Sequence, residues 1–569
     1  MFVVFEGIDG SGKTTISNRV AKALRARGLN VEHLREGGAF ASRVTQGIRD
    51  FCRDARNMAL TPRAELMLYA AREAQLAEEV LRPAMERADV IIADRYFYTA
   101  EVLAAAGRDL PQSEIRPIVD TAAGGLWPEL AFLIDVDPSV ARGRRKVAKM
   151  MNPTDRRPVS RKGLTGSGLQ VRIRAGYRTL AESDPKRWVI VENSDADLDQ
   201  VVAALTDLIA RAHQGEPVAG GPLHLENAPA AAPAPAPIDS VAAACQAFLA
   251  WVDRRAFHEP MLAAYVLAGM SGTEIDTRRL ALAGAAPRVI ARGLRGLSDA
   301  VSWRLRRLLL DAAPAEVALS LEDLAAEASD AWALRELLAD TVPAAVASSL
   351  EGLDDATAWA LRAELYDRAP EAVLASLALL DSPRAWELRT RWISERGGLD
   401  RACDSYERAK ALAKSVTGLD GAQAWEMRKA TRDMAPVGAV TSLRGVTSDR
   451  AWAWRAKAIG RAPKAVLSTI AGMDDTRAWA LRVSNARRCR EALDSMAGID
   501  HPIGWDLRET CIDIWPANTI KSLGVLVSGQ RGHEMLLRAL AGHPDQISLL
   551  KQAAGIATGA HLTPSVMAA

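Results

Sequence analysis

The sequence predicts an α/β domain with a parallel sheet, followed by an all-α array of helical repeats. Two observations predict this fold class. Short apolar runs alternate with helical patterns over residues 1–213, and an Ala-Trp-x-Leu-Arg motif then recurs, often at intervals of 27 residues. Alternating strand and helix signals are typical of a parallel sheet with helices on both faces. A repeat of this length is typical of stacked helical units.

Five apolar runs within residues 1–213 have the length of strands. The first ends at Glu6, without a basic flank or a cleavage site, so we interpret it as a strand and not as a signal peptide. Helical patterns alternate with the runs, which favours parallel pairing. The runs are Phe2–Phe5, Val31–Leu34, Val90–Ala93, Leu130–Val136 and Trp188–Val191.

A composition change separates the two predicted domains. Residues 214–240 contain GEPVAGGP and APAAAPAPAPIDS. Alternating alanine and proline cannot build a core and behave as a semi-rigid extended spacer. We therefore expect a first domain over residues 1–213, a linker over residues 214–240 and a helical domain over residues 241–569.

A phosphate-binding motif follows the first predicted strand. Residues 7–14 read GIDGSGKT, which fits G-x-x-x-x-G-K-[ST], and a helical pattern begins at Thr15. In such a loop the backbone N–H groups surround phosphate, the lysine reaches the β- and γ-phosphates and the hydroxyl binds Mg²⁺. Here these two residues are Lys13 and Thr14. The predicted ATP-binding residues are Gly7, Ile8, Asp9, Gly10, Ser11, Gly12, Lys13, Thr14 and Thr15.

A family resemblance rests on six segments and covers residues 1–210. FEGIDGSGKTT, LREGG, ADRY, ELAFLIDVDP, AGYRTLA and RWVIVENS occur in the order seen in bacterial-type thymidylate kinases, which are P-loop nucleoside monophosphate kinases. The resemblance implies transfer of the γ-phosphoryl group of ATP to a nucleoside monophosphate, dTMP in this family, with Mg²⁺ as cofactor. It also implies a homodimer through this domain.

The Asp94-Arg95-Tyr96 motif ends the strand pattern DVIIADRY. The resemblance implies that Arg95 holds the acceptor phosphate and that Asp94 lies near Mg²⁺. A guanidinium fork suits a phosphate monoester, whereas a structural Asp–Arg pair is the alternative. The substrate-binding residues expected from the resemblance are Asp9, Arg35, Glu36, Tyr69, Arg72, Arg95 and Tyr96.

A basic lid is expected after the run that ends near residue 136. Gly10 stands where some family members carry an arginine, which implies that a lid arginine acts here instead. A closing basic lid would exclude water and neutralise the transferring group, whereas a solvated basic face is the alternative for any single residue. The expected catalytic residues are Lys13, Asp94, Arg95, Arg142, Arg145 and Arg156.

The base pocket departs from the family pattern. Leu103 and Ala104 stand where the family has Tyr-Gln, and Tyr69-Ala70-Ala71-Arg72-Glu73 stands where it has Phe-Ala-Ala-Asp-Arg. Two alternatives to a dTMP kinase therefore stay open. One is a kinase for another nucleoside or deoxynucleoside monophosphate, and the other is a nucleotide-sensing switch whose output is the repeat array.

The repeats combine a tryptophan with an arginine three residues later and, in most units, a proline eleven residues later. Proline suits the first turn of a second helix, so each unit reads as two short helices of an α-solenoid that looks HEAT-like. We expect tryptophan to fill the repeat core and arginine to stack on it or cap a helix. An arginine stripe that binds an acidic partner is the alternative. The tryptophans are Trp303, Trp332, Trp359, Trp386, Trp425, Trp452, Trp479 and Trp505.

The composition restricts partners and location. The net charge is +2, which gives no reason to expect nucleic acid or a membrane as partner. The five cysteines are scattered and without CxxC spacing, so we expect free thiols in the cytoplasm and no zinc site. The sequence does not identify the protein partner expected for the array.

Overall fold

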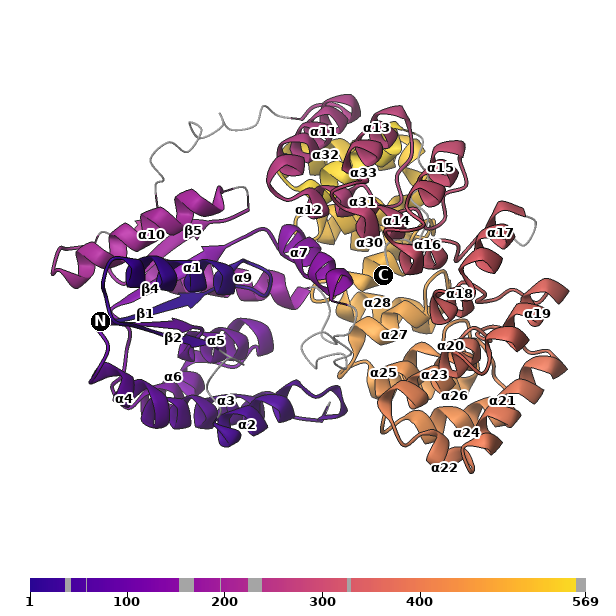
Figure 1. Cartoon of the computed structure of the whole chain (residues 1–569), viewed down its shortest axis with the longest axis horizontal. Helices are drawn as coiled ribbons and strands as arrows, with labels where there is room; N and C mark the ends of the chain where they lie inside the picture. Colours follow the sequence, from indigo (N-terminus) through magenta and orange to yellow (C-terminus); the bar gives the residue numbers. More distant parts are fainter. Residues whose placement is uncertain are drawn as a thin grey trace. The chain divides into compact units, whose positions relative to one another are not determined.

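The computed structural model describes residues 1–35, 42–57, 59–152, 168–194, 196–218, 220–223, 238–324 and 329–558. The chain divides into two compact units (Figure 1), with the main division between residues 234 and 235, inside the segment expected to be the linker. Residues 146–151, at the end of the helix over residues 138–151, group with the second unit. The first unit contains the strands, and the second contains the helical array. Each unit is described by itself.

The first unit is built on a six-stranded parallel sheet with the order β2-β3-β1-β4-β5-β6. This confirms the predicted parallel sheet, and each of the five expected runs is a strand. The sixth strand lies within the segment expected to be the linker and pairs with β5. The strands are β1 (Phe2–Glu6), β2 (Val31–Arg35), β3 (Val90–Asp94), β4 (Leu130–Asp135), β5 (Trp188–Glu192) and β6 (Gly221–Pro222).

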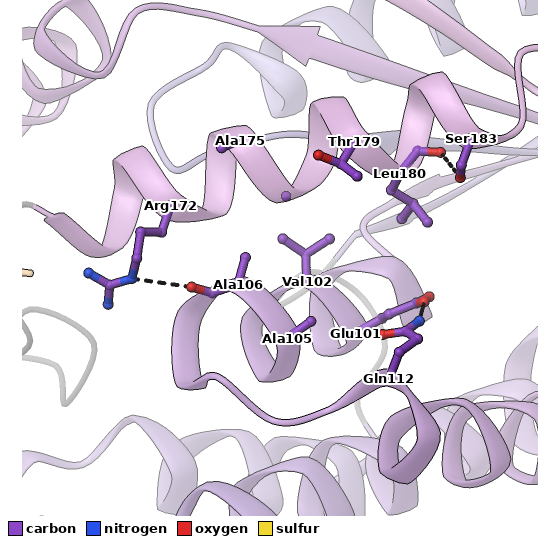
Figure 2. A pocket seen from close by; sticks show the side chains of 11 residues that line it. Glu101, Val102, Ala105, Ala106, Gln112, Arg172, Ala175, Thr179, Leu180 and Ser183 are labelled. Carbon is purple, nitrogen blue, oxygen red and sulfur yellow. Dashed lines mark hydrogen bonds between the residues drawn. The ribbon is translucent and has the colours of Figure 1, made fainter. Parts of the chain in front are cut away.

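Helices cover the sheet in the alternating order that a parallel sheet requires. They are α1 (Lys13–Ala26), α2 (Arg43–Arg53), η1 (Ala55–Asn57), α3 (Pro62–Leu76), η2 (Ala77–Leu81), α4 (Arg82–Met85), α5 (Phe97–Val102), η3 (Leu103–Gly107), α6 (Gln112–Ala123), α7 (Pro138–Met151), α9 (Gly168–Ser183) and α10 (Leu198–His213). Helices α5 and α9 contact each other. Together with η3 they line a cavity of about 620 Å³ (Figure 2).

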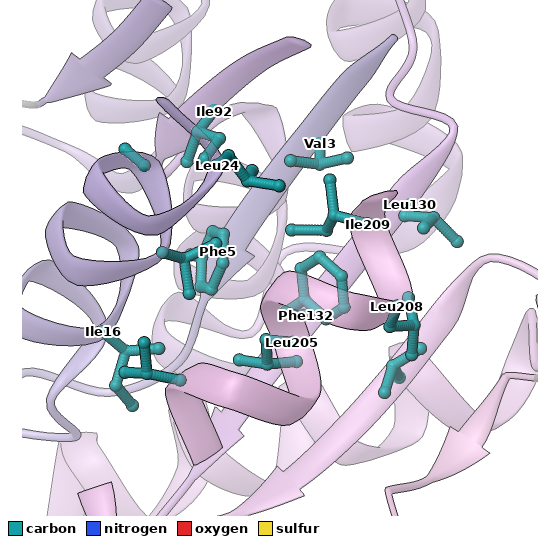
Figure 3. Packing of buried hydrophobic residues seen from close by; sticks show 14 of the residues in the cluster. Val3, Phe5, Ile16, Leu24, Ile92, Leu130, Phe132, Leu205, Leu208 and Ile209 are labelled. Carbon is teal, nitrogen blue, oxygen red and sulfur yellow. The ribbon is translucent and has the colours of Figure 1, made fainter. Parts of the chain in front are cut away.

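The core on one face of the sheet lies under α1 and α10. Val3 and Phe5 of β1 and Phe132 of β4 pack there against Ile16 of α1 and Leu205 of α10 (Figure 3). Successive side chains of a strand point to opposite faces. The other face therefore receives Glu6 of β1 and Asp135 of β4, and both contact side chains of α9.

The second unit is all helical, as predicted, and in most of its repeats the second helix begins at a proline. Its helices are α11 (Val241–His258), α12 (Pro260–Val266), α13 (Thr273–Leu282), α14 (Pro287–Gly293), α15 (Ala300–Leu308), α16 (Pro314–Leu319), α17 (Ser329–Leu338), α18 (Pro343–Ser348), α19 (Ala356–Leu365), α20 (Pro370–Ala375), α21 (Pro383–Glu395), α22 (Leu399–Ala402), α23 (Tyr406–Ser415), α24 (Ala422–Thr431), α25 (Pro436–Thr441), α26 (Asp449–Ala458), α27 (Pro463–Thr469), α28 (Thr476–Asn485), α29 (Glu491–Asp494), α30 (Pro502–Cys511), α31 (Pro516–Leu523), η4 (Gly524–Ser528), α32 (Gln530–Gly542) and α33 (Ile547–Ala557).

The array closes on itself, which the sequence did not predict. The second helices contact one another in succession from α12 to α33, and α11 packs against α33 (Figure 1). Lys551 of α33 is half-buried and donates to the carbonyl oxygen of Ala268, 2.8 Å away, just beyond α12. The two ends of the array therefore cap each other, and its terminal helices are not exposed in the way that those of an open solenoid are.

The repeated arginines lie in the buried interior of the array. Within the described residues of the array, nine arginines have exposed fractions of 1% or less. The Arg362 guanidinium shows the pattern: it donates to the carbonyl oxygens of Leu350 (2.7 Å) and Leu353 (2.8 Å) and to the Ser376 hydroxyl (3.0 Å). The nine are Arg279, Arg306, Arg335, Arg362, Arg389, Arg428, Arg455, Arg482 and Arg508.

These contacts join neighbouring units. Leu350 lies just beyond α18, and Ser376 caps α20, so one guanidinium binds the carboxyl ends of two successive second helices. Those ends carry unpaired carbonyls and the negative pole of the helix dipole. Burial lowers the pKa of the Arg362 guanidinium to about 10, so it stays charged at neutral pH. The sequence left open that the repeated arginines form a stripe that binds an acidic partner. Their burial excludes this alternative.

The tryptophans only partly fill the core, so that expectation is wrong for five of the eight repeat tryptophans. Trp303, Trp332, Trp359, Trp386 and Trp505 are half-buried, whereas Trp425, Trp452 and Trp479 are buried. Each ring lies beside the arginine three residues later, with distances of 4.5–5.1 Å from guanidinium carbon to ring centroid. The arginine, and not the tryptophan, occupies the centre because only the guanidinium can satisfy the helix-end carbonyls.

Candidate active site

The phosphate-binding loop connects β1 to α1 at the carboxyl edge of the sheet. Two glycines are required by their surroundings. Gly10 has φ 91°, and a Cβ there would lie 2.3 Å from the carbonyl oxygen of Ala141 in α7. Gly12 has φ 98°, and a Cβ there would lie 2.8 Å from Nδ2 of Asn193, which donates to the carbonyl oxygen of Ser11 (2.7 Å). The loop is thus held from both sides by residues that follow β4 and β5.

Lys13 and Thr14 open α1 and face the end of β3. The Lys13 ammonium is buried and donates to the carbonyl oxygen of Ile8, 2.9 Å away. The Thr14 hydroxyl donates to Oδ2 of Asp94 at 2.5 Å. The structure therefore joins the predicted phosphate lysine, the predicted Mg²⁺ hydroxyl and the predicted Mg²⁺ carboxylate in one place.

Charges of both signs surround Lys13. The pKa of Lys13 is lowered to about 8: burial and then Arg95 lower it, while Asp9, Asp94 and Glu6 act to raise it. A partly desolvated ammonium is stabilised by a bound anion. The arrangement suits a polyphosphate placed against the loop.

Arg95 bridges the loop and the helix that follows β3. Its Nη1 donates to the carbonyl oxygen of Gly7 (3.2 Å) and to the Thr99 hydroxyl (3.1 Å), and its Nη2 pairs with Asp9. The Arg95 side chain is 14% exposed. Its backbone has φ 81°, a left-handed conformation that is rare for arginine. A guanidinium held above a nucleotide-binding loop can receive an acceptor phosphate.

Comparison with known proteins gives one family. The family model for thymidylate kinase matches residues 5–204. A thymidylate kinase of Nitratidesulfovibrio vulgaris (strain DP4) is 34% identical over 226 residues, which are 39% of this chain and 98% of that protein. A thymidylate kinase of Bifidobacterium longum subsp. infantis is 34% identical over 206 residues, which are 36% of this chain and 84% of that protein.

The chain belongs to the thymidylate kinase family. Its first unit is accordingly a nucleotide-binding phosphotransferase, as the sequence predicted. The array begins at Val241 and lies beyond the matched residues. In the described part of the chain, no helix is long and apolar enough to span a membrane.

The arginines expected in a lid of this thymidylate kinase family member are only partly described. Arg142 and Arg145 lie on α7, and Arg145 reaches the loop: a Cβ at Gly10 would lie 3.1 Å from its Cγ. Desolvation and Arg142 lower the pKa of Arg145, while Asp9 raises it. Arg156 lies outside the described residues, and so does Glu36, which was expected to contact substrate.

Three residues expected to bind substrate lie in the interior. Tyr96 is 1% exposed, and its ring packs 5.2 Å from that of Phe2, at the end of β1 opposite the loop. The structure therefore does not bring this ring to the loop, and its contact with substrate stays a prediction. Arg72 is buried and pairs with its neighbour Glu73. Tyr69, on the same helix, is 3% exposed. The side chain of Arg35 lies outside the described part.

Other residues around the loop were missed by the sequence analysis. Glu6 ends β1 and is fully buried, and Gln170 of α9 accepts from the backbone N–H of Asp9 at 3.3 Å. Asp135 ends β4 and accepts from both Arg174 (2.7 Å) and Arg178 (2.8 Å) of α9. An acidic residue at the end of an apolar run was the available signal for Glu6 and Asp135, because parallel strands end at one edge.

Proposed function

We propose that the first unit transfers the γ-phosphoryl group of ATP to dTMP. The observation that carries this proposal is the Arg95 guanidinium, held between Gly7, Asp9 and Thr99 above the nucleotide-binding loop. The relatives named thymidylate kinase, aligned over nearly their whole length, support the acceptor. Positive charge on Lys13 and Arg95 would stabilise a transferring phosphoryl group from two sides.

Mg²⁺ fits the residues present. The Thr14 hydroxyl and the Asp94 carboxylate meet at 2.5 Å, and hard oxygen donors of this kind are the ligands that Mg²⁺ prefers. The Ser11 hydroxyl is buried in the loop and has no hydrogen-bond partner among the residues that the structure describes, as expected where a phosphate oxygen binds. Bound Mg²⁺ would neutralise phosphate charge, and Thr14 and Asp94 would hold it.

The acceptor base is tested by comparing monophosphates. The purified chain is assayed with ATP and each of dTMP, dUMP, UMP, CMP, GMP and AMP in a coupled assay of ADP release. We expect the highest kcat/KM with dTMP. A preference for another monophosphate would support the alternative specificity, which the departures at Leu103, Ala104 and Glu73 motivate. Nucleotide binding without turnover of any of them would support the switch hypothesis.

We also propose a homodimer through the first unit, in the cytoplasm. Helices α2 and α3 pack against each other and expose Val44 (52%), Phe51 (49%) and Met67 (57%), which is apolar surface that an interface would cover. Sedimentation of the wild-type chain and of Phe51→Glu tests it. A dimer that Phe51→Glu dissociates is expected, and a monomeric wild type would contradict the proposal.

For the array we propose a role in protein interaction. Leu308 and Leu337 occupy the same position in successive units and are 61% and 63% exposed. Such a repeated apolar edge suits a protein partner. We expect Leu308→Ser with Leu337→Ser to release a protein that co-purifies with the wild-type chain, without change in the unfolding of the array. Undiminished co-purification would count against this edge.

A further inference from the structure

A buried hydrogen-bond network joins the end of β1 to Arg95. Glu6 is 0% exposed, and its Oε1 accepts from the backbone N–H of Tyr96 at 2.8 Å. Its Oε2 accepts from the hydroxyls of Thr99 and Tyr177, both at 2.7 Å. The Thr99 hydroxyl in turn accepts from Nη1 of Arg95 at 3.1 Å. Glu6 thus lies one side chain away from the guanidinium that faces the loop.

The same network holds the backbone at Arg95. A left-handed backbone is unfavourable for a residue other than glycine and persists only where its surroundings fix it. The backbone N–H of Arg95 donates to the carbonyl oxygen of Phe5 (3.0 Å), and the backbone N–H of Tyr96 donates to Oε1 of Glu6. Two successive amides are therefore tied to the end of β1, which sets the direction in which the Arg95 side chain leaves the chain.

Helix α9 supplies the third member of the network. Tyr177 donates to Glu6 from this helix, and its hydroxyl lies 2.9 Å from that of Thr99. Near the start of the same helix, Gln170 accepts from the N–H of Asp9, the residue that pairs with Arg95. Helix α9 thus contacts Glu6 and Thr99 through Tyr177, and it contacts Asp9, the ion-pair partner of Arg95, through Gln170.

Donors surround the buried Glu6 carboxyl group. Its two oxygens accept from the backbone N–H of Tyr96 and from the hydroxyls of Thr99 and Tyr177. Burial outweighs the opposing effects of Arg95, Tyr177, Tyr96 and Thr99, so the pKa of Glu6 is raised above its ordinary value. The network reaches Arg95 through Thr99 and leaves Nη2 of Arg95 to Asp9.

We propose that Glu6, Thr99 and Tyr177 are positioning residues that orient Arg95 toward the phosphate of the acceptor. The proposal rests on the proposed function in taking a nucleoside monophosphate as acceptor. It assigns these residues no contact with substrate. Their loss should therefore weaken binding of the acceptor's phosphate group, and it should leave binding of the nucleoside and of ATP unchanged.

Tyr177→Phe tests the proposal because it removes one hydroxyl and keeps the ring. We expect KM for dTMP to rise about tenfold, with KM for ATP changed less than twofold. The inhibition constant of thymidine, which has no phosphate, should change less than twofold. Thr99→Ala should act in the same way, and Thr99→Ser, which keeps the hydroxyl, should restore the wild-type KM.

The cavity side of α9 offers a matched pair of variants. Figure 2 shows Val102 pointing toward α9 across the cavity, which Ala106 and, on α9, Ala175 and Thr179 also line. A Cβ at Gly176 would lie 2.7 Å from Cβ of Ala106, so Gly176→Ala pushes α9 away from η3 next to Tyr177. We expect Gly176→Ala to raise KM for dTMP, and Thr179→Ala, on the same helix, to leave it unchanged.

The outcomes separate this proposal from the proposed function. If the wild-type chain does not phosphorylate dTMP, the proposed acceptor is wrong, and the same variants are measured with the monophosphate that it uses and with the matching nucleoside. If the wild type is active and Tyr177→Phe and Thr99→Ala keep KM for the monophosphate within twofold, the positioning role is overturned. Equal weakening of monophosphate, nucleoside and ATP would also overturn it, because that is the result of a general structural defect.

Discussion

Arginine has opposite roles in the two units. Arg95 of the first unit is paired with the carboxylate of Asp9, lies at the nucleotide-binding loop and keeps part of its side chain exposed. Arg362 of the array is buried, lies against Trp359 and binds only neutral acceptors in the interactions described above. Both guanidinium groups stay charged, but only the first is placed where a ligand can reach it.

The difference teaches how surroundings decide the use of a charge. A carboxylate partner such as Asp9 can be exchanged for a phosphate, because both are anions that fit the guanidinium fork. Helix-end carbonyls are fixed parts of the backbone and cannot be exchanged. A guanidinium that binds them is therefore committed to the fold.

Lys13→Ala should give the largest effect in the first unit. Among the described residues, its ammonium donates to the loop carbonyl of Ile8, so its loss weakens phosphate stabilisation with little loss of packing. We expect kcat/KM to fall about 10²–10³-fold, with unchanged thermal unfolding. Lys22→Ala, an exposed lysine on the same helix, is the control. Near-normal activity of Lys13→Ala would refute the assignment of the loop.

Arg362→Met should be the strongest single change in the array. It leaves the carbonyls of Leu350 and Leu353 and the Ser376 hydroxyl without their donor, which should lower the free energy of unfolding by about 2–4 kcal/mol. Arg368→Met, which removes an exposed ion pair with Asp340, should cost less than ~1 kcal/mol. Denaturation followed by tryptophan fluorescence reports the array, which contains twelve of the fourteen tryptophans. Equal effects of the two variants would contradict the central role of the buried arginine.

The tryptophans provide a smaller, graded test. Trp452 is 6% exposed and lies between Arg455 and Arg477, so Trp452→Ala should cost about 3–5 kcal/mol. Trp359 is half-buried, so Trp359→Ala should cost about 1–3 kcal/mol. Denaturant titration of both variants measures the difference. A larger loss for Trp359→Ala would show that tryptophan burial does not govern the stability of the units.

The smallest expected signal is the proton uptake that accompanies ATP binding, which depends on the pKa of Lys13 and amounts to a fraction of a proton. Burial lowers this pKa to about 8 in the free protein, and bound phosphates favour the charged form. ATP binding at pH 8 should therefore take up about half a proton, and ATP affinity should fall as the pH rises through 8. Calorimetry in buffers of different ionisation enthalpy measures the uptake. Uptake that persists in Lys13→Met would assign it to another group.

Local signals predicted the parts of the molecule that depend on adjacent residues. The apolar runs predicted the five strands. The phosphate-binding motif and the Asp-Arg-Tyr motif predicted that Thr14 and Asp94 both lie at the nucleotide site, where they meet. The placement of Tyr96 could not be predicted in this way. It depends on the left-handed backbone of Arg95, which arginine rarely adopts and which the buried carboxylate of Glu6 supports.

Long-range contacts account for what was missed in the array. The Trp-x-x-Arg spacing predicted that the two side chains meet, but not that the arginine lies deeper. That outcome depends on carbonyls twelve residues earlier in the chain, as for Leu350 and Arg362. Closure by α11 and α33 joins residues nearly 300 positions apart, and no repeat pattern signals it.

The most direct test of the account compares Arg95→Ala with Arg362→Met in one assay of kcat/KM for dTMP. We expect Arg95→Ala to lose about 10²-fold or more, with unchanged unfolding of both units. Arg362→Met should keep kcat/KM within twofold while its array unfolds at lower denaturant. If Arg362→Met loses activity as Arg95→Ala does, or if Arg95→Ala keeps it, the division of roles between the two arginines is contradicted.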